Sequence, residues 1–261
     1  EISCMKPSKD KPEMIRPNIF DEAQGIEAWF TCKNADLYST GQKIPGLNIG
    51  FNTREAKEVV RKNRKKLLNA LGIQPEKVAF AEQVHGNRVQ VVSQGGTFEN
   101  VDALVTSVKG LSLAIQVADC AAVLMADSKN GVIAAAHAGW RGAAGDIVPE
   151  TVAAMTSLGA ETSNIKAFIS PCISKENFEV GEEVAEKFPP EYVDYKTYNK
   201  PHVDLKGFLE DQLLKLGIDR TRIEVNEGCT MEDAERFYSY RREQQGSGRM
   251  LGLIRYKDIG A

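Results

Sequence analysis

The sequence LSLAIQVADCAAVLMADSKNGVIAAAHAGWRG, at residues 111–142, contains three short apolar runs separated by turn residues. The runs are Leu111–Val117, Ala121–Ala126 and Val132–Ala136, and the turn signals are Lys109-Gly110 and Lys129-Asn130-Gly131. Apolar runs of this length between turn signals are typical of buried β-strands. The segment therefore predicts a block of neighbouring strands.

The flanking sequence predicts further strands and the helices that cover them. We expect strands at Val78–Val84, Arg88–Val92, Ala103–Thr106, Ile165–Ile169, Arg222–Val225 and Met250–Arg255. We expect helices over Thr53–Leu71, Ala143–Leu158, Val180–Phe188 and Leu205–Leu216. This order predicts an α+β fold, a single domain of mixed β-sheet layers covered by helices. We expect residues 19–261 to form this domain and residues 1–18, which are polar and interrupted by proline, to form a flexible N-terminal arm.

The composition is that of an ordinary soluble protein. The 261 residues are 42% hydrophobic and 26% charged, with a formal net charge of −3, so no basic field recruits nucleic acid or an anionic membrane. No apolar run approaches the roughly 20 residues that span a bilayer, and the first ten residues show no signal-peptide core. The five cysteines form no CxxC motif, which favours reduced thiols. We therefore expect a cytoplasmic protein.

Three reactive side chains follow predicted strands at their ends. His85, Cys120 and His137 each come after an apolar run, and the chain has only three histidines in all. Two imidazoles and one thiolate would leave a fourth position open on a tetrahedral metal, as in catalytic zinc sites. Each residue taken singly also fits a structural part, because strand-end histidines are commonly satisfied polar residues and free cysteines are commonly buried. The residues alone leave both interpretations open.

Arg64 lies on or beside the apolar stripe of the predicted helix Thr53–Leu71. It is four residues after Val60 and three before Leu67, so it shares the core-facing side of the helix. A guanidinium in that position needs an anion or a ring of carbonyls. An acidic side chain of the protein is one such anion.

The strings EQVHGNRV, ADCAAVLMAD, AAHAGWRGAAGDIV and FYSYRREQQGSGRMLGLI resemble the YfiH-like family, and the resemblance extends from about Leu47 to Ile254. These laccase-domain proteins were first named multicopper polyphenol oxidoreductases, and members were later described as purine nucleoside phosphorylases. The resemblance implies the family's cysteine-hydrolase-type fold. It also implies that His85, Cys120 and His137 form the metal and active site, with zinc as the usual ion.

The resemblance assigns roles to further residues as well. Asn48 and Arg64 match family positions near the same pocket, which makes phosphate the anion expected at Arg64. Arg141 would be a second phosphate clamp or would orient His137. Asp119 would be a partner of a ligating imidazole, with its side chain pointing away from that of Cys120.

The function that the resemblance favours is zinc-dependent phosphorolysis of adenosine. Inosine, guanosine and methylthioadenosine are further expected substrates, and adenosine deamination is an expected second activity. The partners are then a purine nucleoside and phosphate. The sequence does not fix the oligomeric state.

Three other functions remain open. The first is a copper-dependent polyphenol oxidase, although three histidines are too few for a multicopper centre and only a single His-Cys-His copper fits. The second is a cysteine hydrolase, including peptidoglycan-precursor editing, with Cys120 as nucleophile and a histidine as base. The third is a module that binds a metal or nucleoside without catalysis.

Some segments depart from the family pattern or have no expected catalytic part. Thr31-Cys32-Lys33-Asn34-Ala35 and Ser170-Pro171-Cys172-Ile173-Ser174-Lys175 differ from family motifs, which leaves Cys172 without an assigned role. His202 matches no signature histidine, and Cys229 is expected to serve packing. Arg241, Arg242 and Arg249 are expected either in a turn near the site or on the solvated surface.

Overall fold

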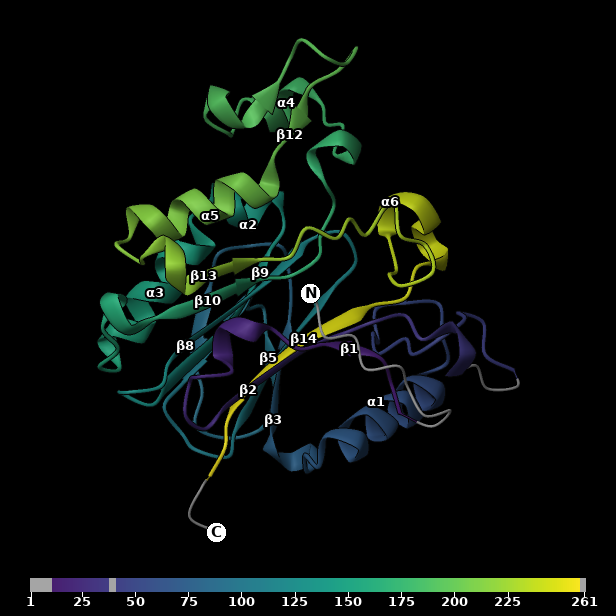
Figure 1. Ribbon diagram of the computed structural model, residues 1–261. Helices are drawn as coiled ribbons and strands as arrows, with labels where there is room; N and C mark the ends of the chain where they lie inside the picture. Colours follow the sequence, from purple (N-terminus) through teal and green to yellow (C-terminus); the bar gives the residue numbers. More distant parts are fainter. Residues whose placement is uncertain (1–10, 38–40, 259–261) are drawn as a thin grey trace.

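The computed structural model describes residues 11–37 and 41–258, and in it two six-stranded sheets form the centre of the molecule (Figure 1). The first sheet contains, in spatial order, β1 (Met14–Ile15), β2 (Ile26–Thr31), β14 (Met250–Tyr256), β7 (Ser112–Val117), β3 (Val78–Glu82) and β5 (Gly96–Glu99). The second contains β13 (Ile223–Val225), β10 (Lys166–Ile169), β8 (Ala121–Asp127), β9 (Val132–Ala138), β6 (Ala103–Thr106) and β4 (Val89–Val91). The α+β, single-domain prediction is confirmed.

The two sheets pack face to face because their strands alternate side chains between two faces. In β7, Leu113 and Ile115 are buried in a shared core with Leu124 of β8 and Ala135 of β9. The sheets approach closely at Gly252 of β14, where an added Cβ would lie 2.7 Å from the Ala122 Cβ. This close packing fixes the ends of β7, β8 and β9 relative to one another.

Helices cover the outer face of each sheet. Helix α1 (Lys57–Leu71) packs Leu67, Leu68 and Leu71 against Phe80 of β3 and the outward residues of β7 and β14. Helices α2 (Trp140–Ala144), α3 (Ile147–Ser157) and α5 (Leu205–Lys215) cover the second sheet. The shorter elements are α4 (Glu182–Ala185), β11 (Val193–Asp194), β12 (His202–Val203) and α6 (Tyr240–Glu243).

Short 3-10 turns connect many of these elements. They lie at Asn18–Phe20, Ala35–Leu37, Pro75–Lys77, Thr162–Asn164, Lys175–Asn177, Pro190–Tyr192, Arg220–Arg222 and Gln244–Gly246. Within the described residues, no helix combines the length and the apolar character needed to cross a bilayer.

The element boundaries differ from the sequence prediction in several places. The helix predicted over Ala143–Leu158 is two helices, because Asp146 takes a left-handed conformation with φ of 66° between them. The helix predicted over Val180–Phe188 shortens to α4. Strands β1, β2, β5, β11 and β12 were not predicted, and the helix predicted from Thr53 begins at Lys57. Of the predicted arm, residues 1–10 lie outside the described residues, and β1 pairs with β2.

Candidate active site

His85, Cys120 and His137 converge although they come from three separate segments. His85 follows β3, Cys120 occupies the turn between β7 and β8, and His137 lies near the end of β9. Their ligand atoms all lie within 4.8 Å of one another. The two imidazole rings meet edge to face, with centroids 4.8 Å apart and an interplanar angle of 80°. The packed sheets thus present two nitrogens and one sulfur to a single point.

A buried carboxylate that the sequence analysis did not identify, Asp102, organises both histidines. Its side chain accepts hydrogen bonds from the backbone N–H groups of His85 at 2.9 Å and Gly86 at 2.7 Å, and from that of Val84 at 3.3 Å. It also receives the Nδ1–H of His137 at 2.8 Å. This bond leaves the Nε2 of His137 for the cluster, and the backbone bonds hold His85 in a left-handed conformation with φ of 62°.

The sheet register brings Asp102 to this position. Ala103 of β6 pairs with Ala136 of β9, and the backbone N–H of His137 donates to the carbonyl of Asp102 at 2.7 Å. In the sequence, an acid directly before a predicted strand was the only signal, and it resembles an ordinary turn residue.

Gly139 leaves room for the cluster. A Cβ at this position would lie 2.8 Å from the Sγ of Cys120 and 3.5 Å from the Cδ2 of His85. The first contact is too short for any side chain, so the backbone after β9 passes directly against the cysteine. The close contact with Cys120 therefore requires glycine at position 139 of the HAGWRG string.

The charges of the cluster favour a thiolate. Burial acts to raise the pKa of Cys120, but the charges and hydrogen bonds of His137 and His85 outweigh it and lower the pKa to about 6. Burial likewise opposes protonation of His137, yet Cys120 and Asp102 raise its pKa to about 9. One thiolate and two imidazoles are donors that both zinc and copper bind, so this donor set fits a metal ion.

The cluster opens into a pocket of about 1130 Å³. Five cationic side chains line it against two acidic ones, and the cations are Lys57, Arg64, Arg141, Arg241 and Arg249. Aromatic rings supply apolar surface, namely Phe51, Phe80, Trp140, Phe178 and Tyr240. The pocket thus combines a positive field with flat apolar faces, which suits an anion together with a planar ring.

Arg64 lies between two aromatic rings at the pocket wall. Its guanidinium carbon is 4.2 Å from the ring centroid of Phe51 and 4.1 Å from that of Phe80. The Nε–H donates to the carbonyl of Ile49 at 2.8 Å. Of the two anions considered for Arg64, an acidic side chain does not pair with it among the described residues, and burial lowers the pKa of Arg64 to about 10.

Arg141 and Arg249 approach the pocket in different ways. Arg141 is exposed, with its guanidinium 4.3 Å from the ring centroid of Trp140. Arg249 is partly buried and donates from Nη1 to the carbonyls of Ser247 at 3.1 Å and Gly248 at 2.9 Å. Burial lowers its pKa, while the negative charges of Cys120 and Asp119 act against that.

Asn48 is fully buried and lies outside the set of residues that line the pocket. Its Oδ1 accepts from the backbone N–H groups of Arg249 at 2.9 Å and Gly50 at 3.1 Å, and its Nδ2 donates to Thr53 at 2.9 Å. The structure therefore places Asn48 behind the wall, where it positions the backbone of Arg249.

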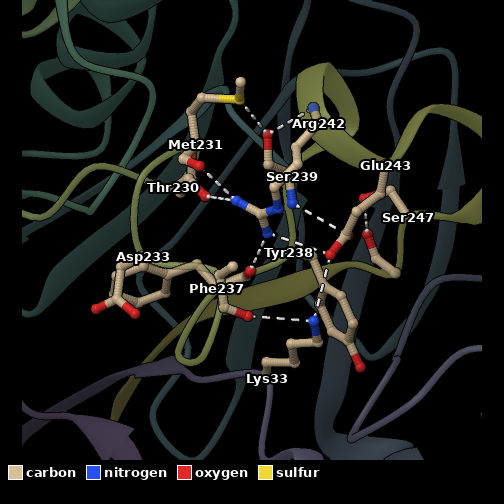
Figure 2. A network of polar contacts seen from close by, with 12 residues as sticks. Lys33, Thr230, Met231, Asp233, Phe237, Tyr238, Ser239, Arg242, Glu243 and Ser247 are labelled. Atoms are coloured by element: carbon tan, nitrogen blue, oxygen red, sulfur yellow. Dashed lines mark hydrogen bonds and ion pairs between the residues drawn. The ribbon is translucent and has the colours of Figure 1, made fainter. Parts of the chain in front are cut away.

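Arg242 anchors the segment that carries Arg241 and Arg249 (Figure 2). Its guanidinium donates to the carbonyls of Thr230, Met231 and Phe237 at 2.6–2.7 Å and to Glu243 at 3.1 Å. All the acceptors are the protein's own groups. Arg242 therefore stabilises the wall of the pocket and is not available to bind a ligand.

Asp119 contacts this segment instead of an imidazole. Its carboxylate accepts from the Thr230 hydroxyl at 2.7 Å and the backbone N–H of Arg241 at 2.6 Å. Asp102, and not Asp119, therefore accepts the imidazole N–H of His137.

His202, Cys172 and Cys229 do not line the pocket. His202 is buried, bonds the carbonyl of Lys175 through Nδ1 at 2.8 Å and stacks on Tyr198. Cys172 and Cys229 are both buried and are neighbours in an isolated parallel bridge.

Comparison with known proteins gives a consistent picture. The family model described as multi-copper polyphenol oxidoreductase laccase matches residues 27–257. A purine nucleoside phosphorylase of Corynebacterium glutamicum is 39% identical over 214 residues, which cover 79% of this chain and 85% of that protein. The adenosine deaminase RL5, from an unknown prokaryotic organism, is 29% identical over 265 residues, which cover 93% of this chain and 99% of that protein. The crystal structure of YlmD from Geobacillus stearothermophilus superimposes with a TM-score of 0.88 at 28% identity, covering 99% of this chain and all of that one.

Proposed function

This chain belongs to the multi-copper polyphenol oxidoreductase laccase family, and from that membership we propose that it is a purine nucleoside phosphorylase acting on adenosine. In this reaction a phosphate oxygen replaces the purine at C1′ of the ribose. The observation that carries the proposal is the placement of the His85, Cys120 and His137 cluster in a pocket with five cations and two acids. Inosine, guanosine and methylthioadenosine are further proposed substrates.

The attacking phosphate lies beside the cluster in this proposal. Arg141 is exposed at the pocket, and Arg249 is close enough to Cys120 for the charges to interact. Guanidinium groups bind phosphate through paired N–H donors. These two arginines would hold the phosphate and orient one oxygen toward C1′, while Arg64 contributes positive charge from α1.

The purine is proposed to stack on the aromatic surface of the pocket. Phe51 and Tyr240 are exposed at 39% and 41%, so their rings are available to a ligand. Stacking of a purine on an aromatic side chain contributes about 1–3 kcal/mol per base.

We propose zinc as the resident ion, with copper as the alternative. His85, Cys120 and His137 would hold it and leave one position open. A bound zinc ion would supply Lewis-acid stabilisation to a reacting oxygen. Asp102 holds the His137 Nδ1–H, so His137 offers Nε2 without losing that proton. A reducing cytoplasm is the proposed setting, in keeping with the free thiols of the described cysteines.

Two other activities use the same groups. The family relative named as an adenosine deaminase supports attack of water at C6 of adenosine as a second activity. The lowered pKa of Cys120 beside His137 favours a cysteine hydrolase as the competing function, since a thiolate next to an imidazolium is a nucleophile.

The test is chromatography of adenosine after incubation with metal-analysed protein, with and without phosphate. The proposal requires adenine and ribose 1-phosphate only when phosphate is present, and inosine would report deamination. Cys120→Ala must abolish the cleavage while the exposed Arg54→Ala leaves it intact. A chelator separates the competing function, because it inhibits a metalloenzyme and spares a thiolate hydrolase. Untouched adenosine in both tubes would reject the phosphorylase.

A further inference from the structure

The cations of the pocket fall into two groups that differ in their relation to the cluster. Arg249 interacts electrostatically with the negative charges of Cys120 and Asp119, and the backbone N–H of Arg241 donates a hydrogen bond to Asp119. Arg64 lies on α1, which packs against the first sheet, whereas Arg141 lies on α2, which covers the second sheet. The two arginines therefore line the pocket from elements that cover different sheets.

Arg64 has donors to spare where it lines the pocket. Of its guanidinium groups, Nε is bonded to the carbonyl of Ile49. Within residues 11–37 and 41–258, its two terminal amino groups have no hydrogen-bond acceptor, and no carboxylate forms an ion pair with it. Phe51 and Phe80 hold the guanidinium plane in place but carry no formal charge. A fixed, partly buried cation without a counter-ion favours an anionic ligand.

Lys57 adds a second cation to the same region. It precedes Arg64 by seven residues on α1, which places both on the same face of the helix two turns apart. Both line the pocket, and the ammonium of Lys57 forms no ion pair within the described part of the chain. The nearby Arg61 differs, because it is exposed and paired with Glu58 at 3.0 Å.

We propose that Arg64 and Lys57 form a second anion subsite, which binds a phosphate group carried by the nucleoside, so that purine nucleoside 5′-monophosphates are substrates of this pocket. The inference rests on the proposed function. The phosphate that attacks C1′ has to lie beside the reacting centre, where Arg249 and Arg141 are placed. An anion bound by the two cations of α1 then belongs to a part of the substrate that does not react, and the 5′ position of ribose is one that can carry phosphate.

The chemistry of the step is unchanged for such a substrate. The C1′–N9 bond breaks and a C1′–O bond to inorganic phosphate forms. The purine leaves with the electron pair of the C1′–N9 bond and takes up a proton that dihydrogen phosphate gives up. The second product is ribose 1,5-bisphosphate in place of ribose 1-phosphate.

The experiment compares binding of adenosine and adenosine 5′-monophosphate by calorimetry in phosphate-free buffer at low salt. We expect the monophosphate to bind at least about tenfold more tightly, as one charge-assisted bidentate contact would give. Lys57→Gln should reduce this advantage about threefold or more, measured as the ratio of the two affinities in the same variant. Arg64→Lys should reduce it further. The control is Lys62→Gln, an exposed lysine of α1 that does not line the pocket.

Each outcome bears on one claim. Equal affinities for the two ligands, or an equal loss for both in Lys57→Gln, overturn the inference. If inorganic phosphate cancels the monophosphate's advantage and Lys57→Gln raises the KM for phosphate, the subsite serves free phosphate and the inference is again overturned. Phosphate-dependent cleavage of adenosine without monophosphate preference rejects only the second subsite. Monophosphate preference without any cleavage rejects only the proposed phosphorylase.

Discussion

Asp102 holds His137 at two points, accepting the backbone N–H at its carbonyl at 2.7 Å and the ring Nδ1–H at its carboxylate at 2.8 Å. The same carboxylate binds the backbone of the loop that carries His85. One buried acid therefore sets the position of both histidines. A substitution at Asp102 can thus alter the geometry of the cluster while His85, Cys120 and His137 themselves stay unchanged.

Asp102→Asn should weaken metal binding about 10- to 100-fold, the usual effect of removing a partner of a ligating histidine. The amide can present one oxygen, but its N–H₂ group faces backbone N–H donors. We therefore also expect a loss of about 1–3 kcal/mol in the free energy of unfolding. Zinc competition against a chromophoric chelator and urea unfolding measure the two effects.

The matched control for this variant is Asp36→Asn, an exposed acid outside the pocket. It should change neither quantity. Unaltered zinc affinity in Asp102→Asn would show that the histidines keep their geometry without the carboxylate.

Cys120 should be the most reactive of the described thiols in the metal-free protein. Its pKa is lowered to about 6, whereas burial, with help from Glu13, raises that of Cys32 to about 12, and burial raises that of Cys172 to about 12. A lowered pKa makes the thiolate present at neutral pH, so iodoacetamide labelling of Cys120 should rise through pH 6 and then level off. Peptide mass spectrometry after chelation follows the labelling, and added zinc should suppress it. A labelling curve with its inflection near pH 9.0, the ordinary pKa of a thiol, would contradict the stabilisation of the Cys120 thiolate by His137 and His85.

Gly139→Ala should damage the cluster while leaving the rest of the fold intact. The new methyl group would meet the Cys120 sulfur at 2.8 Å, and displacing a reacting group by about 1 Å can cost about 100-fold in rate. We expect lower zinc affinity and lower kcat/KM for adenosine with unchanged far-UV circular dichroism. Gly246→Ala is the control, since an added Cβ there meets nothing within 4 Å. Equal activity of the two variants contradicts the steric argument.

Arg242 and Arg141 should separate stability from activity. Arg242→Ala leaves the carbonyls of Thr230, Met231 and Phe237 without their donor, so we expect a loss of about 1–3 kcal/mol in thermal or urea unfolding. Arg141→Ala removes an exposed side chain and should change stability by less than about 0.5 kcal/mol. It should instead raise the KM for phosphate about tenfold. A stable Arg242→Ala protein, or an Arg141→Ala protein with unchanged phosphate dependence, counts against the assignment.

Strong local patterns explain what could be predicted from the sequence. The apolar runs of β7, β8 and β9 and the turn residues between them define strands whatever their partners are. The edge strand β5, GTFE, has no such pattern, since most of its residues are exposed. β2 reads IEAWFT and is paired with β14, more than 200 residues further along the chain. Its assignment depends on a partner that no local window contains.

In the candidate site, too, some residues are evident from the local sequence and others only from the tertiary fold. His85, Cys120 and His137 stand out because reactive side chains end apolar runs. Asp102 does not, because its part depends on the register of β6 against β9. The different contacts of Arg241 and Arg242 are also set by the tertiary fold. Arg241 lines the pocket, whereas Arg242 donates hydrogen bonds to the protein's own carbonyls. Adjacent arginines in a sequence carry no such distinction.

The position of β14 has a consequence for how the protein is made. This strand lies between β2 and β7 in the first sheet, yet it is the last strand in chain order. Because synthesis proceeds from the N-terminus, β2 and β7 emerge from the ribosome long before the strand that joins them. The pocket wall that carries Arg249 also precedes β14 directly. A nascent chain therefore contains all three residues of the cluster well before β14 is available, and the first sheet can be completed only after β14 has been synthesised.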